Sequence, residues 1–108
     1  MSYLKEYFED GLANPYMFTS DEDALCEACE AVGVFVNESA PMFARTTALN
    51  NAGRLVGGMA RGGIRDKITD ILRKCCDVPE GRSVSLTAEE RQFIGDGIEK
   101  RLYKPFYK

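Results

Sequence analysis

Apolar side chains recur at steps of three and four along most of the chain, which is the spacing of one face of an α-helix. A first helix is predicted over residues 2–12, capped by Ser2 and ended by the turn at Asp10 and Gly11. The clearest helix follows a capping box at residues 19–22 and ends near Asn37. Its apolar face carries Leu25, Ala28, Cys29, Val32, Phe35 and Val36.

Three more helices are predicted in the rest of the chain. The third starts at Ser39 and Pro41 and has a stripe of mostly small residues, namely Met42, Thr46, Leu49, Gly53, Val56 and Ala60. Paired glycines at 57–58 and 62–63 then favour a break or kink, since each costs a helix interior about 1 kcal/mol relative to alanine. The fourth helix carries Ile64, Ile68, Ile71, Leu72 and Cys75.

A second capping box at residues 87–90 opens the last helix, which Pro105 closes. This helix carries Phe93, Ile94, Ile98 and Leu102. The pattern demands no strand pairing. We therefore predict an all-α, compact, single-domain bundle of about five helices over residues 1–108, with a glycine-rich kink near the middle.

Composition adds a prediction about the compartment. No apolar run approaches the ~18 residues of a membrane span, and acids stand near the N-terminus where a signal peptide would be basic. We therefore expect a cytoplasmic protein without membrane contact, whose four cysteines stay reduced.

Charge is unevenly distributed, although the net value is only −3. Residues 1–40 carry one basic and nine acidic side chains, whereas residues 41–76 carry seven basic and two acidic ones. The simpler interpretation is that the two segments face each other across the fold or a subunit interface. The alternative is binding of an anion or a basic partner.

Catalytic chemistry is poorly represented. Histidine is absent, which removes the commonest general acid-base and the usual nucleophile pairs. The glycine signatures of nucleotide-binding loops and of hydrolase elbows are also absent. We expect no enzymatic activity, no cofactor and no catalytic residue.

The cysteines allow two interpretations. Cys26 and Cys29 have C-x-x-C spacing, and Cys75 and Cys76 bring the set to the four thiolates of a zinc site. However, the first pair lies within an amphipathic helix behind acids that raise a thiol pKa, and the second pair is adjacent rather than spaced to chelate. We favour buried free thiols, with zinc and redox roles as alternatives.

The most unusual segment combines glycines with basic side chains. Main-chain N–H groups freed by glycine form anion-binding nests, so the segment is a candidate site for a phosphate or a nucleic-acid backbone. In the alternative interpretation the glycines let two helices pack closely, and the arginines pair with the acidic second helix. The candidate residues are Arg54, Gly57, Gly58, Arg61, Gly62, Gly63, Arg65 and Lys67.

Aromatic side chains gather near both ends of the chain. They either complete the core or form an exposed patch of the kind enriched at protein–protein contacts. The candidate interface residues are Tyr3, Tyr7, Phe8, Tyr16, Phe18, Tyr103, Phe106 and Tyr107.

The preferred functional prediction is a small non-enzymatic binding or regulatory protein that acts by protein–protein contact and forms a homodimer. An inhibitor or adaptor, such as those encoded by phages and mobile elements, fits an acidic chain of this length. The first alternative is a nucleic-acid or nucleotide binder that uses residues 54–67. The second is a zinc or thiol-redox module.

Overall fold

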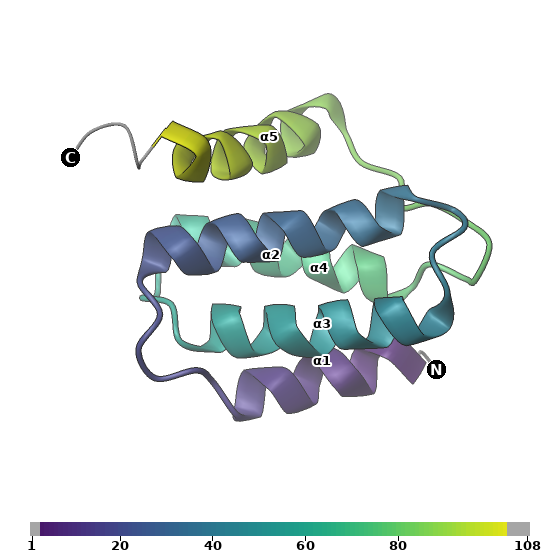
Figure 1. Ribbon diagram of the computed structural model, residues 1–108, viewed down its shortest axis with the longest axis horizontal. Helices are drawn as coiled ribbons and strands as arrows, with labels where there is room; N and C mark the ends of the chain where they lie inside the picture. Colours follow the sequence, from purple (N-terminus) through teal and green to yellow (C-terminus); the bar gives the residue numbers. More distant parts are fainter. Residues whose placement is uncertain (1–2, 104–108) are drawn as a thin grey trace.

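The computed structural model describes residues 3–103, and the side chains of residues 3–99. These residues form five helices: α1 (Tyr3–Ala13), α2 (Asp21–Val36), α3 (Met42–Gly57), α4 (Gly63–Cys76) and α5 (Ala88–Tyr103). Successive helices run in opposite directions, so the loops alternate between the two ends of the bundle (Figure 1). The radius of gyration is 13.2 Å, close to the ~13 Å typical of a compact chain of this length. The predicted all-α bundle is confirmed.

The helix boundaries follow local capping chemistry, with three corrections to the sequence-based prediction. The predicted end at Asp10 and Gly11 is wrong, because α1 continues through Gly11 to Ala13. At α5 the reciprocal capping box is confirmed, because Thr87 N–H donates to Glu90 Oε1 and Glu90 N–H donates to Thr87 Oγ1. At α2 the predicted box is wrong by one residue: the cap is Ser20, whose hydroxyl oxygen accepts from Asp23 N–H at 3.2 Å. Pro41 occupies the N-cap position of α3, without a side-chain cap hydrogen bond, instead of lying in the first turn of the helix.

The glycine-rich break is confirmed as a complete interruption between two helices. α3 ends at Gly57 and α4 begins at Gly63. Gly62, directly before α4, has a φ of +157°, in a region that residues with a Cβ rarely adopt. The predicted caps at Ser2 and Pro105 lie outside the described residues.

The core is one apolar cluster to which every helix contributes. α1 to α4 supply the wholly buried side chains, while α5 adds the partly buried Phe93, Ile94 and Ile98. α5 lies outside α2 and packs mainly against it (Figure 1). Among the described residues, no helix is long and apolar enough to cross a membrane. Fully buried positions include Phe8, Cys29, Val32, Phe35, Leu49, Val56, Ile68, Leu72 and Cys75.

α1 and α3 approach each other so closely that their main chains touch. A Cβ at Gly53 would overlap the carbonyl oxygen of Phe8 and lie 3.0 Å from Leu12 N. A Cβ at Gly11 would overlap the carbonyl oxygen of Asn50 and lie 3.0 Å from Arg54 N. Gly53, one member of the predicted stripe, therefore lies at the contact with α1, together with Asn50 and Arg54, whereas Ala60 lies beyond the end of α3.

The most deeply buried polar group belongs to Arg45 in α3, which is 0% exposed. Its guanidinium donates to three main-chain carbonyl oxygens, of Asn37 (3.2 Å), Pro79 (3.1 Å) and Arg82 (2.6 Å). It also lies over the ring of Phe35, with 5.3 Å between Cζ and the ring centroid. Arg45 thereby joins the α2–α3 loop to the α4–α5 loop.

The main-chain contact between α1 and α3 can be tested with Gly53→Ala. Alanine is the better helix former, yet the new methyl group must push α1 away, so we expect a loss of about 1–3 kcal/mol of unfolding free energy. Gly63→Ala is the matched control, because a Cβ there meets nothing within 4 Å. Urea denaturation of both variants decides the point, and equal stabilities would contradict the close crossing.

The role of Arg45 can be tested with Arg45→Met, which fills the space above Phe35 but removes the charged donor of three main-chain carbonyl oxygens. Each lost partner costs on the order of 1–3 kcal/mol, so the variant should lose at least ~3 kcal/mol of stability. Arg45→Lys keeps the charge without the planar fork of donors, so its unfolding free energy should lie between those of the wild type and the methionine variant. A methionine variant as stable as the wild type would show that the loops do not need the guanidinium.

Candidate functional site

The loops before α2 and before α4 lie at the same end of the bundle (Figure 1). The first of these, residues 14–20, is held against α3 by Arg54. Its Nε donates to the Asn14 carbonyl oxygen at 2.9 Å, and its Cζ lies 4.1 Å from the centroid of the Tyr16 ring. Tyr16 also donates its N–H to the Arg54 carbonyl oxygen at 3.1 Å and its hydroxyl to Asn51 Oδ1. This half of the loop is fixed in place.

The same loop presents two large apolar side chains to solvent. Met17 is 78% exposed and Phe18 is 99% exposed. The other side of the loop is anchored as well, since Asp21 in the first turn of α2 accepts a hydrogen bond from Ala60 N–H at 3.2 Å. Phe18 therefore projects from a segment that is tied down on both sides.

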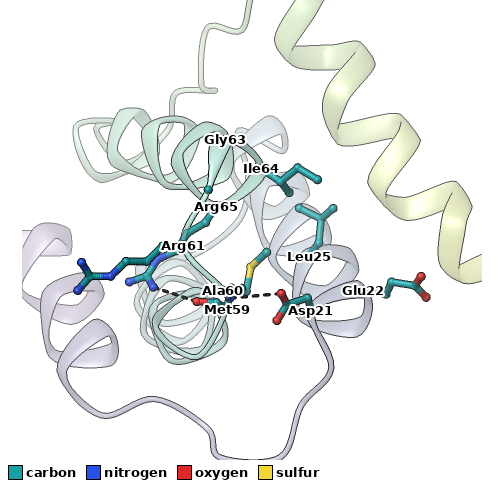
Figure 2. Close-up of a pocket in the computed structure, with 10 residues that line it drawn as sticks. Asp21, Glu22, Leu25, Met59, Ala60, Arg61, Gly63, Ile64 and Arg65 are labelled. Atoms are coloured by element: carbon teal, nitrogen blue, oxygen red, sulfur yellow. Dashed lines mark hydrogen bonds between the residues drawn. The ribbon is translucent and has the colours of Figure 1, made fainter.

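Beside this loop lies a pocket of about 290 Å³ between the start of α2 and the α3–α4 loop (Figure 2). Leu25, Met59 and Ile64 supply its apolar lining, and Ile64 is 52% exposed. Asp21 and Glu22 line one side, whereas Arg61 extends away from them on the other (Figure 2). The walls therefore carry charges of both signs.

The eight residues of the predicted anion site do not gather in one place. Arg61, Gly62, Gly63 and Arg65 line the pocket. A Cβ at Gly57 would lie 2.9 Å from the carbonyl oxygen of Leu12, and a Cβ at Gly58 would lie 2.8 Å from that of Tyr16. The close-packing interpretation therefore fits Gly57 and Gly58. Lys67 lies elsewhere on α4, 3.5 Å from Glu89 Oε1.

The arginines of this segment serve the main chain rather than the acidic face of α2. Arg54 donates to Asn14 as described, and Arg65 Nη1 donates to the Met59 carbonyl oxygen at 2.9 Å. For these two residues the predicted pairing with the acidic second helix is wrong. Arg61 is exposed and makes no hydrogen bond or ion pair with residues 3–99.

The predicted aromatic interface is divided in a similar way. Phe8 is wholly buried, so it belongs to the core and not to a surface. Tyr3 is 57% exposed and meets the half-buried Tyr7 edge to face, with their hydroxyl oxygens 2.9 Å apart. Phe18 is exposed as expected. The side chains of Tyr103, Phe106 and Tyr107 lie outside the described residues.

The sequence pattern missed two prominent side chains. Phe43, in the first turn of α3, is 80% exposed, and it was not among the candidate interface residues. Arg45 is buried, although its type predicts exposure. The spacing does carry a signal for each, because Phe43 falls outside the predicted stripe and Arg45 lies one helical turn before Leu49, a member of that stripe.

All four cysteines are buried as free thiols, as predicted. Burial raises the pKa of Cys29 and Cys75 to about 12, and that of Cys76 to about 11. For Cys29 the nearby Cys26 and Glu30 raise the pKa further, in that order. Such thiols are protonated at neutral pH and make poor nucleophiles. Within the described part of the chain, no group of three or more metal-ligating side chains is placed to hold an ion.

These pKa values predict how stability responds to alkali. Unfolded thiols ionise near their ordinary pKa of 9.0, whereas the folded ones retain their protons up to about pH 11–12. The unfolded state therefore binds fewer protons above pH 9, and unfolding free energy should fall as the pH rises from 9 toward 12. Urea titrations at each pH measure the slope, which should be shallower in Cys75→Ala. An unchanged slope would contradict the raised pKa of that thiol.

Comparison of this chain with models of known protein families, with characterised proteins and with solved structures gave no match. What the protein does must therefore be inferred from its own surface.

Proposed function

We propose that the protein is a small, non-enzymatic binding or regulatory module, an inhibitor or adaptor, that captures a protein partner at the end of the bundle bearing Phe18. The observation that carries this proposal is the 99% exposure of Phe18 on an anchored loop. Leaving a phenylalanine fully in water forgoes the ~1.5–3 kcal/mol that its burial would contribute to folding. Large aromatic side chains supply much of the binding energy at protein interfaces.

The anchoring of the loop favours binding further. Arg54 and Tyr16 hold one side, and the hydrogen bond from Ala60 N–H to Asp21 holds the other. A side chain on a fixed loop loses less conformational entropy on binding than one on a flexible segment. Met17 and Phe18 are thus presented in advance of any encounter.

The adjoining pocket supports a protein partner over a small ligand. Its volume of about 290 Å³ lies at the lower limit of the ~300–1,000 Å³ typical of ligand sites. A pocket of this size suits one inserted side chain, and its lining of Leu25, Met59 and Ile64 suits an apolar one. Phe18, on the loop before α2, and the pocket at the start of α2 lie at the same end of the bundle (Figure 1).

The charges around the pocket do not favour a nucleic acid. Asp21 and Glu22 line the same recess as Arg61, so a phosphate entering it would approach two carboxylates. Arg54 and Arg65 already donate to carbonyl oxygens. The absence of histidine and the raised pKa of the buried thiols support a non-enzymatic role, and four reduced thiols are consistent with work in the cytoplasm.

The decisive variant is Phe18→Ser. Because Phe18 has almost no buried surface to lose, the unfolding free energy should change by no more than about ±0.5 kcal/mol, as for a neutral surface substitution. Binding to a partner captured from the source cell and then purified should weaken by at least ~2 kcal/mol, as for an interface hot spot. Isothermal calorimetry with the purified pair measures the loss.

Phe43→Ser is the matched control, since Phe43 is 80% exposed in the first turn of α3, at the opposite end of the bundle (Figure 1). It should bind the partner like the wild type. If Phe43→Ser abolishes binding and Phe18→Ser does not, the partner docks at the other end. Binding that falls steeply as salt rises would point to phosphate contacts and to the nucleic-acid alternative.

A further inference from the structure

A second surface, separate from the Phe18 end, lies along the seam between α2 and α5. It is a groove of about 550 Å³ whose lining is mainly apolar: Val32, Val36, Leu86, Ile94 and Ile98. The two helices are antiparallel (Figure 1). Cys29 lies against Gly97 near the middle of the two helices, where the groove ends, and Val84 N–H donates to the Phe35 carbonyl oxygen beyond its other end.

Two helix-interior glycines, Gly33 of α2 and Gly95 of α5, line this groove. A Cβ at either position would meet nothing within 4 Å. Interior glycines weaken a helix, and at Gly11, Gly53 and Gly97 the fold itself requires the small residue because a neighbour occupies the space. Nothing inside the described chain gives Gly33 or Gly95 such a reason. Their lack of a side chain leaves room for something that approaches from outside.

The charges on the groove are arranged with opposite signs at its two ends. Glu30 lies with Cys29 and Ile98 at one end, and Arg91 lies with Val36 and Leu86 at the other. Both charged side chains are exposed, and Arg91 keeps its place by donating to the Leu86 carbonyl oxygen at 3.1 Å. The glycines fall between these ends.

We propose that this groove is the contact surface of a two-fold homodimer. A two-fold axis that lies in the plane of this face and crosses the helices at the middle of the groove brings Glu30 of each chain to the end of the groove that holds Arg91 of the other. The same axis brings the glycine-lined centres of the two grooves face to face. The surface is complementary to itself, which identifies the occupant as a second copy.

The dimensions of the face agree with a dimer. A 16-residue helix is about 24 Å long and, with its side chains, about 10 Å wide, so two such helices side by side present a face on the order of 500 Å². Two such faces reach the ~1,000 Å² at which specific interfaces begin. The homodimer expected from the sequence is thus assigned to α2 and α5 instead of to the aromatic residues.

The test is a charge exchange followed by sedimentation equilibrium on the full-length chain. The wild type should have twice the mass of one 12.0 kDa chain at micromolar concentration. Glu30→Arg and Arg91→Glu should each weaken the dimer at least tenfold by opposing like charges, and the double variant should recover it. Wild-type protein that stays monomeric up to submillimolar concentration overturns the proposal.

Gly33→Ala combined with Gly95→Ala gives a second, independent readout. The methyl groups occupy open space, so the melting temperature of the isolated chain should rise by a few degrees, while the dimer weakens at least tenfold. A dimer that persists in this variant and in both charge reversals forms through another face, which also overturns the proposal. Phe18→Ser should leave the dimer intact, so failure of the partner-binding proposal is distinguishable from failure of this one.

Discussion

The guanidinium of Arg45 sets the geometry at one end of this molecule. It gathers the carbonyl oxygens of Asn37, Pro79 and Arg82, which belong to two loops far apart in sequence. Once those loops are joined, Val84 comes within hydrogen-bonding distance of Phe35, and the chain enters α5 alongside the end of α2. The direction of α5, and with it the shape of the α2–α5 groove, follows from this buried cation.

The opposite end of the bundle repeats this solution with other residues. Arg54 and Arg65 also direct their guanidinium groups to main-chain carbonyl oxygens. Basic side chains in the middle of the chain therefore organise loops, and only some of them, such as Arg73 with Glu9 at 2.6 Å, join the acidic N-terminal region. A guanidinium suits this work because its planar fork holds several acceptors at once. The excess of basic residues in the middle of the sequence is therefore explained in part by arginines that hold loops in place.

The five helices could be predicted from the sequence because burial of one face imposes a period of 3.6 residues, and the pattern carries that period directly. The cap of α2 was misplaced because Thr19 and Ser20 are both good caps with an acid three residues later, and only the main-chain geometry selects Ser20. Arg45 escaped prediction because polar type and buried position disagree, and its acceptors come from distant loops. The candidate site was scattered for a similar reason: sequence neighbours on a helix point in different directions.

The contact between Gly11 and Gly53 has a consequence for how this fold tolerates change over time. A crossing made by side chains can drift, since one residue shrinks as its neighbour grows. A crossing made by main chain has no such freedom, because carbonyl oxygens occupy the space and no substitution trims them. Distant descendants of this chain would keep glycine at both positions long after the rest of the two helices had diverged. The glycine pair would then still identify related chains whose overall sequence identity is too low to do so.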